Sequence, residues 1–256
     1  MMTIISLEEL LSKARLSPYH KLLATDSDKE CLAYYFQTLE GAAMMLPLFN
    51  LIEVILRNRL DLQIKSMAAT GLLPLHGTIT PDRWFESVTD GFSRSHSKVV
   101  NLGKQSKPPA TTDDYIAQLD FGYYVYLLHD RHADATQKYC YIWRPGVLQA
   151  VFPGIMARPR SLNGLFGLLR QCEDMRNRLC HHEPMWKGRH SGKHGGYENI
   201  RQKFLLLFEV LRYLSPEMAD IAISTALTGF SDVKQLFVSQ CKDKYSDNLE
   251  SVKFLS

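Results

Sequence analysis

Several features that would assign this 256-residue chain to a known class of protein are scarce or absent. Its cysteines are odd in number and include no C-x-x-C pair; they are Cys31, Cys140, Cys172, Cys180 and Cys241. Such scattered cysteines argue against a disulfide framework and favour a reducing compartment. A net charge of +3 is too small to mark the whole chain as a nucleic-acid binder, so any RNA contact must come from local clusters.

Signals for secretion and for membrane insertion are also missing. The N-terminus MMTIISLEELLSK has neither a basic start nor a long apolar run, and Ser6 with Glu9 forms a capping-box pattern that predicts a helix. The most apolar stretch, residues 42–56, is interrupted by Pro47 and Glu53 and is too short and too polar to span a bilayer. We therefore expect a cytoplasmic protein without a membrane partner.

Strand-like alternation, internal repeats and low-complexity tracts are absent as well, whereas apolar residues at helical spacing recur along the chain. With 45% hydrophobic residues, the chain can bury a sizeable core. We predict an all-α fold in a single domain over residues 1–256, with a turn at Ser17-Pro18. The expected helices cover residues 6–14, 28–46, 48–69, a short segment after Thr80-Pro81, 113–130, 161–183, 200–214, a short segment from Pro216, and 231–245.

Two segments are predicted to be irregular. Residues 93–110 contain basic side chains but no acidic one and end in Pro108-Pro109, which indicates a mobile basic loop. Such a loop either contacts phosphate or is an ordinary solvated connection. In residues 186–199, four glycines alternate with basic residues that include Lys187, Arg189 and Lys193, so this segment is predicted to be flexible and to grip a substrate.

The segment from Arg160 to Trp186, RSLNGLFGLLRQCEDMRNRLCHHEPMW, combines a well-marked helix with an unusual polar cluster at its end. Ser161 is a suitable N-cap, and Pro184 is expected to stop the helix. One helix face is apolar and is predicted to be buried. Its residues are Leu165, Leu168, Leu169, Cys172, Met175 and Leu179.

A polar stripe accompanies this apolar face. It contains Arg170, Glu173, Asn177 and His181, while Arg176 lies at its border with the core and is predicted to be partly buried. Arg176 and His181 are roughly 140° apart around an ideal helix, so they cannot share one small pocket unaided. A second copy of the helix, packed about a twofold axis, would bring two arginines and two histidines to one cleft. The function hypothesis therefore includes a homodimer.

The chemistry of such a cleft suits a phosphodiester. Arginine binds phosphate oxygens with a planar fork and keeps its charge, which matches the stabilisation of a phosphorane. Histidine transfers protons near neutral pH, and a position near a helix C-terminus favours the imidazolium of His181. The 2′-hydroxyl of RNA can be the nucleophile, so that no metal is needed and cleavage leaves a cyclic phosphate.

A purely structural interpretation uses the same residues. Arg176 can pair with Glu173 one turn back, Asn177 can bond to a neighbouring carbonyl, and the two histidines can be solvated residues at a helix end. A zinc site formed by Cys180, His182, His190 and His194 matches no common ligand spacing. We therefore predict no metal and no cofactor.

The run RNRLCHHEP, Arg176 to Pro184, resembles the R-N-x3-H signature of the HEPN superfamily. With its second histidine followed by Glu-Pro, it is similar to the Abi-like (AbiD/AbiF) family of bacterial phage-defence proteins. The segments LFNLIEVILRNRL, DFGYYVYLL and IWRPGVLQAVFP extend the resemblance along most of the chain. Cys180 departs from the family pattern, where a small or apolar residue is more usual.

The resemblance implies a helical bundle of the HEPN type with additional N-terminal and C-terminal helices. It also implies a homodimeric, metal-independent endoribonuclease that acts as an abortive-infection toxin and is restrained by an inhibitory RNA or a protein antitoxin. The catalytic roles fall on Arg176 and His181, with Asn177 as support. We expect further RNA contacts from Arg170, Arg178, His182, Lys187, Arg189 and Lys193.

Several alternatives stay open. In the helix at 48–69, Arg57 and Arg59 either have structural roles or, as the resemblance suggests, face the RNA. The aromatic stripe of residues 113–130 is more typical of a core than of a base-stacking platform. The whole protein can also be one that binds RNA without cutting it, or a structural helical interaction protein.

Overall fold

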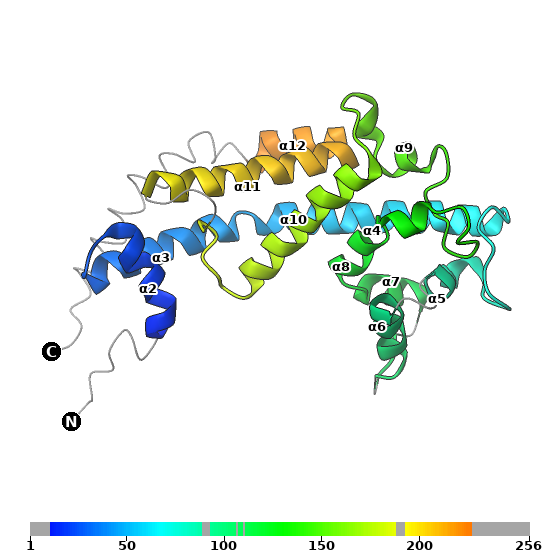
Figure 1. Cartoon of the computed structure of the whole chain (residues 1–256), viewed down its shortest axis with the longest axis horizontal. Coiled ribbons are helices and arrows are strands. Elements are labelled where there is room, and N and C mark those ends of the chain that lie inside the picture. Colours follow the sequence, from blue (N-terminus) through cyan, green and yellow to red (C-terminus); the bar gives the residue numbers. More distant parts are fainter. Residues whose placement is uncertain (1–10, 89–92, 106, 110, 188–192, 227–256) are drawn as a thin grey trace. The chain divides into compact units, whose positions relative to one another are not determined.

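The structure is a computed structural model that describes residues 11–88, 93–105, 107–109, 111–187 and 193–226. Within these ranges, α-helices and short 3-10 helices are the only regular elements (Figure 1). The predicted all-α class is therefore confirmed. The helix predicted at residues 6–14 lies mostly outside the described residues, and the one predicted at 231–245 lies entirely outside them.

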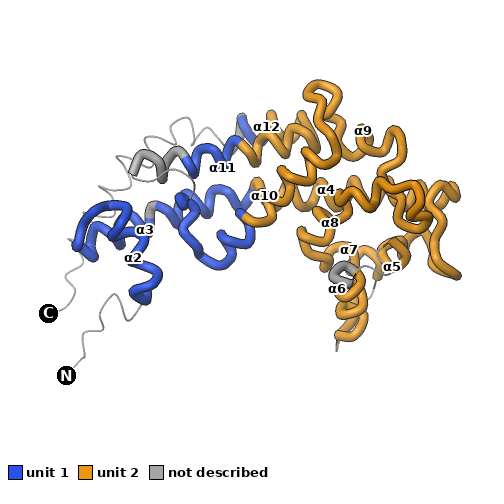
Figure 2. Tube along the Cα trace, in the orientation of Figure 1, with its two compact units in different colours: residues 1–47, 175–205, 221–256 blue, residues 48–174, 206–220 orange. Residues whose placement is uncertain are grey.

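The chain divides into two compact units, coloured separately in Figure 2. Unit 1 comprises residues 1–47, 175–205 and 221–256, and unit 2 comprises residues 48–174 and 206–220. The boundaries fall within four helices, α4 (Leu46–Ala69), α10 (Leu162–Cys180), α11 (Lys193–Leu214) and α12 (Pro216–Ala226). Each unit therefore combines segments that are far apart in the sequence. The prediction of one domain over residues 1–256 stays a prediction.

Unit 1 begins with the helices α2 (Lys13–Leu23) and α3 (Asp28–Ala43). The turn predicted at Ser17-Pro18 is wrong, because α2 continues through Pro18. Proline removes one helical hydrogen bond, but Leu16 and Tyr19 on either side are buried, and this packing stabilises the helix. At the start of α3, the hydroxyl of Ser27 accepts a hydrogen bond from the backbone N–H of Glu30 at 3.3 Å.

The core of unit 1 is built around Tyr19. Its ring centroid lies 5.6 Å from that of Tyr35 and 5.6 Å from that of Trp186, and both contacts are edge-to-face. The Tyr19 hydroxyl is 2.9 Å from the hydroxyl of Thr38, which satisfies both groups inside the core. These contacts join α2 and α3 to the chain that follows α10.

The first long helix of unit 2 is α4 (Leu46–Ala69). It was predicted to begin at residue 48, after a break at Pro47, but it includes Pro47 in its first turn, where proline is tolerated. The side chain of Leu62 is 64% exposed. Leu62 follows Leu60 by two residues and so points to the opposite face. Gly71, with φ of 73°, follows the end of the helix, where the left-handed conformation favours glycine. The buried residues of α4 are Leu48, Phe49, Ile52, Leu56, Leu60, Ile64 and Met67.

In the described part of the chain, one helical run is long and apolar enough to cross a membrane by length and composition alone. It is Asp28–Ala69, which joins α3 and α4, and it is longer than the interrupted stretch expected from the sequence because the helix resumes at Leu46. Core helices of globular proteins pass the same test. The buried face of α4 accounts for its apolar residues within unit 2.

The remaining elements of unit 2 are short, apart from α6. They are η1 (Pro81–Arg83), α5 (Trp84–Val88), α6 (Ser93–Gly103), α7 (Thr112–Gln118), α8 (Phe121–Tyr126), η2 (Asp130–Ala133), α9 (Val147–Val151) and η3 (Pro153–Met156). The last described helix, α12 (Pro216–Ala226), begins in unit 2 at Pro216, as predicted.

Two predictions for unit 2 need correction. Residues 93–103 form a helix rather than a loop; Val99 is buried, and Lys98 pairs with Asp120 at 2.6 Å. The helix predicted at 113–130 is divided because Asp120 accepts a hydrogen bond from the N–H of Tyr123 at 2.8 Å and caps α8. The interpretation of the aromatic stripe as core is confirmed for Tyr123, which is fully buried, whereas Tyr115 and Tyr126 of the stripe are half-buried.

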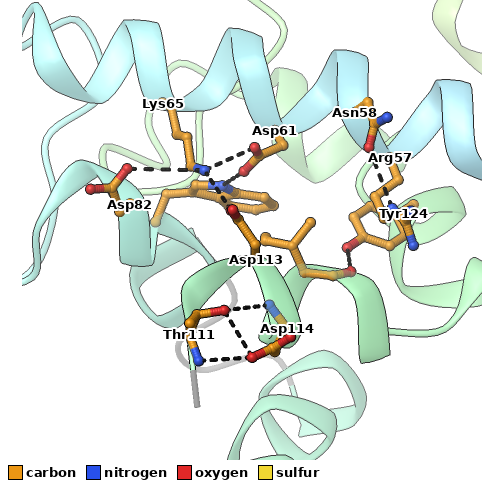
Figure 3. A network of polar contacts seen from close by, with 11 residues as sticks. Arg57, Asn58, Asp61, Lys65, Asp82, Thr111, Asp113, Asp114 and Tyr124 are labelled. Atoms are coloured by element: carbon orange, nitrogen blue, oxygen red, sulfur yellow. Dashed lines mark hydrogen bonds and ion pairs between the residues drawn. The ribbon is translucent and has the colours of Figure 1, made fainter. Parts of the chain in front are cut away.

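A polar network connects α4 to the short helices of unit 2 (Figure 3). The ammonium group of Lys65 lies 3.0 Å from Asp61 of the same helix, 4.0 Å from Asp82 and 3.9 Å from Asp113. Asp61 also accepts a hydrogen bond from the indole of Trp84 at 2.8 Å. One lysine on α4 therefore faces carboxylates of η1 and α7, which aligns these elements.

Gly154 provides a test of packing in unit 2. A Cβ at this position would lie 2.9 Å from the carbonyl carbon of Arg212 and 2.9 Å from the Cα of Tyr213. We predict that Gly154→Ala lowers the free energy of unfolding by about 2 kcal/mol, because two backbone segments must separate. Gly167 is the control, since a Cβ there meets nothing within 4 Å and Gly167→Ala should stabilise its helix by about 1 kcal/mol. If urea unfolding showed the same change in free energy for Gly154→Ala as for Gly167→Ala, the close contact between Gly154 and the backbone of residues 212–213 would be contradicted.

His132 makes unit 2 sensitive to acid. The side chain is fully buried, its Nδ1 is 3.2 Å from the carbonyl of Cys140, and burial lowers its pKa from 6.5 to about 4. Below pH 6.5 the imidazole of His132 binds a proton in the unfolded chain, whereas in the folded protein it binds one only near pH 4 and below. Unfolding free energy should therefore fall by up to roughly 3 kcal/mol over this window. Urea titrations at several pH values should show a smaller loss for His132→Gln, and an unchanged loss would refute the assignment.

Candidate functional site

The predicted helix over residues 161–183 is α10 (Leu162–Cys180). Its start is as predicted, because the hydroxyl of Ser161 accepts a hydrogen bond from the N–H of Gly164 at 3.1 Å. Five of the six predicted core residues are buried, and Leu179 is half-buried. Burial also raises the pKa of the Cys172 thiol, so this cysteine is a packing residue and not a nucleophile.

The end of α10 differs from the prediction. The N–H of His182 donates to the carbonyl of Leu179 at 3.0 Å, and the N–H of Glu183 donates to the carbonyl of Arg178 at 2.8 Å. This pair of bonds is a Schellman motif, and His182 has the left-handed φ of 55° that the motif requires. His181 and His182 therefore lie in a tight turn just beyond the helix, which ends before Pro184 is reached.

Arg178 belongs to this turn. Its guanidinium lies 3.2 Å from the carboxylate of Glu183 and donates to the carbonyl of Pro184 at 3.3 Å. Arg178 was expected to contact RNA, but in the structure its guanidinium contacts Glu183 and Pro184 of the turn. Arg15 on α2, which sequence reasoning did not identify, donates to the carbonyl of His182 at 3.5 Å.

The chain after the turn is anchored in unit 1. Met185 and Trp186 are buried, and Trp186 packs against Tyr19. Two side chains of α11 bind the backbone here: Asn199 donates to the carbonyl of Trp186 at 3.0 Å, and Lys203 donates to the carbonyl of Lys187 at 3.0 Å and to that of Met185. The two histidines are thus held between the end of α10 and a buried segment.

Unit 1 contains the three residues with predicted catalytic roles. Arg176 is half-buried, as predicted, whereas Asn177 and His181 are exposed. Two of the predicted RNA contacts, His182 and Lys187, are exposed on the same unit. An exposed imidazole in a rigid turn can exchange protons with a bound substrate, and a half-buried guanidinium on the preceding helical turn can bind an oxyanion.

The other predicted RNA contacts are placed differently. Arg170 belongs to unit 2, where it pairs with Glu173 at 2.5 Å. Arg189 lies outside the described residues. Lys193 is the first residue of α11, so the flexible segment predicted for residues 186–199 is wrong from this residue onward. Among the described residues, no three histidine, cysteine or acidic side chains are grouped to hold a metal ion.

The arginines of α4 make structural contacts. Arg57 donates to the side chain of Asn58 at 3.5 Å (Figure 3) and to the carbonyl of Ala117 at 3.4 Å. Arg59 donates to the carbonyl of Ala150 at 3.1 Å. These bonds favour the structural interpretation of both side chains over a direct contact with RNA.

Comparison with known proteins adds no assignment: no protein-family model, no curated protein and no solved structure matches this chain. The function of the turn must be inferred from its own residues. Their chemistry is that of an exposed histidine pair next to arginine and asparagine, on a turn that contacts from α2 and α11 hold in place.

The left-handed residue in the turn gives a direct test of the geometry. Glycine adopts a φ of 55° without strain, whereas a β-branched residue is strongly disfavoured there. We predict that the His182→Gly variant is more stable than His182→Val by about 1–2 kcal/mol in urea unfolding. At Asn163, an exposed position of α10, the same pair should show the opposite order because valine is the better helix former. A valine variant as stable as the glycine variant at position 182 would contradict the turn.

Proposed function

We propose that this protein is a metal-independent endoribonuclease whose site is the turn at the end of α10. The observation that carries the proposal is the exposed imidazole of His181, presented by a Schellman turn on the helix that bears Arg176 and Asn177. A histidine that only completes a helix end needs no such support. Here two other helices of unit 1 hold the turn: α2 through Arg15 and through the Tyr19 contact to Trp186, and α11 through Lys203.

The reaction is an internal transesterification. The 2′-oxygen of RNA attacks the adjacent phosphorus as its proton passes to a neutral imidazole, and the bond from phosphorus to the 5′-oxygen breaks as a protonated imidazole donates to that leaving oxygen. The Arg176 guanidinium binds the equatorial oxygens of the phosphorane, where negative charge increases. The products are a 2′,3′-cyclic phosphate and a 5′-hydroxyl, and the two imidazoles have exchanged protonation states.

Two imidazoles in one cleft call for two copies of the chain. Arg176 and His181 are five residues apart on one helix and its cap, so they point in different directions. We propose a homodimer in which two copies of the α10 end meet about a twofold axis, so that one His181 acts as base and the other as acid. Asn177 supports the substrate, and His182 and Lys187 contribute exposed contacts to its phosphates.

The resemblance of Arg176 to Pro184 to the HEPN signature, and to the Abi-like family in particular, supports the same proposal. On this basis we also propose a cytoplasmic phage-defence role, in which the nuclease acts as a toxin restrained by an inhibitory RNA or a protein antitoxin. The HEPN type of the helical bundle belongs to this proposal as well.

The decisive variant is His181→Ala. With labelled single-stranded RNA in EDTA, the wild-type protein should release fragments that end in cyclic phosphate, and the variant should cut at least about 100-fold more slowly because a proton-transfer group is lost. Asn163→Ala, an exposed change on the same helix, is the matched control and should keep the wild-type rate.

Each of the other outcomes of this assay favours a different function for the protein. RNA binding without products would favour a protein that uses the same surface without cutting. Neither binding nor cleavage would favour a structural helical protein. If a folded His181→Ala protein cuts at the wild-type rate, the catalytic assignment is wrong.

A further inference from the structure

Lys203 is a half-buried cation that the proposed reaction does not use. It lies on α11, and both contacts that the described residues provide to its Nζ are backbone carbonyls, those of Met185 and Lys187, the latter at 3.0 Å. Ammonium groups are more often found in water or against carboxylates, because burial of a charge costs free energy. The position of Lys203 therefore needs a reason beyond solubility.

Asn199 precedes Lys203 by one turn of α11 and extends the same contact. Its side-chain amide donates to the carbonyl of Trp186 at 3.0 Å. Residues four apart on a helix lie on one face, so these two side chains bind the carbonyls of Met185, Trp186 and Lys187 in succession. We call this arrangement the α11 clamp.

The clamp acts close to the candidate site. The Schellman turn ends with Glu183, and only Pro184 separates that residue from the clamped Met185. Because proline has a restricted φ, Pro184 can take up little of any backbone shift. A movement of the clamped segment is therefore transmitted to the turn. The place of His181 and His182 at the end of α10 therefore depends on the backbone that Lys203 holds.

The charge of Lys203 is itself sensitive to pH. Burial, and then the positive charge of Arg178, lower the pKa of Lys203 to about 8. Arg178 faces it from α10, and Glu183 of the turn pairs with Arg178. The ammonium form, with three hydrogen-bond donors, is therefore present at neutral pH and is lost in mildly alkaline solution.

We propose that Lys203 is a positioning residue whose ammonium group holds the turn that bears His181 and His182, so that release of the clamp switches the site to a less active form. Its effect on cleavage rests on the proposed ribonuclease function, whereas the clamp is a structural property of unit 1. The two statements can therefore be tested separately.

Trp186 lies inside the clamp and reports on it without any assay of activity. The chain has three tryptophans, so protein labelled with 5-fluorotryptophan should give three ¹⁹F signals, and Trp186→Phe assigns one of them. We expect the Trp186 signal to shift with a midpoint near pH 8, while the signals of Trp84 and Trp143 stay constant. A Trp186 signal that does not change from about pH 6.5 to about pH 9.5 would overturn the clamp.

Lys203→Met should abolish this titration, and Lys21→Met, an exposed lysine of α2 in the same unit, should retain it. Lys203→Arg keeps its charge through this pH range, so it should also remove the step while keeping the Trp186 signal near its neutral position. The same titration in Lys203→Met as in the wild type would show that another group is responsible.

Cleavage of RNA tests the positioning role. At neutral pH, Lys203→Met should lower kcat by roughly 10- to 100-fold, because the proton-transfer group His181 is misplaced. If Lys203→Met lost the ¹⁹F titration but kept the wild-type kcat, the clamp would be supported and the positioning role would be overturned. A wild-type protein that cuts no RNA would overturn the ribonuclease and this role together, and the ¹⁹F titration would still decide the clamp.

Discussion

Three consecutive carbonyls, those of Met185, Trp186 and Lys187, accept hydrogen bonds from two side chains of α11, and the candidate site depends on this contact. It holds a backbone segment that belongs to no helix. Trp186 adds a second attachment, because its ring packs against Tyr19 in the core of unit 1. With both attachments in place, the exposed histidines stand on a rigid support, and pre-organised groups are what catalysis by proton transfer and charge stabilisation requires.

The parts of the fold that follow from local pattern were predicted well. Ser161 caps α10, Arg176 is half-buried at the border of its apolar face, and Tyr123 of the aromatic stripe lies in the core. Predictions failed where long-range packing overrides a local signal. Pro18 is accommodated inside α2, and residues 93–103 form α6 although their basic composition indicated a loop.

The sequence could indicate the chemical groups of the site but not their support. The Schellman turn has histidine where glycine is the usual signal, so the end of α10 was placed too late. Lys203 and Arg15 bind backbone carbonyls, which have no sequence signature, and Arg15 is 167 residues away from its partner His182. These residues were identified only through their contacts in unit 1.

The central claim is that both copies of His181 serve one cleft. Mixing wild-type protein with folded His181→Ala protein, followed by exchange of subunits, tests this claim most directly through the rate of RNA cleavage. A shared cleft predicts that activity falls with the square of the wild-type fraction, to about a quarter at equal amounts, because mixed dimers lack one of the two histidines. A linear fall, to about a half, would show that each copy acts alone and would contradict the shared cleft.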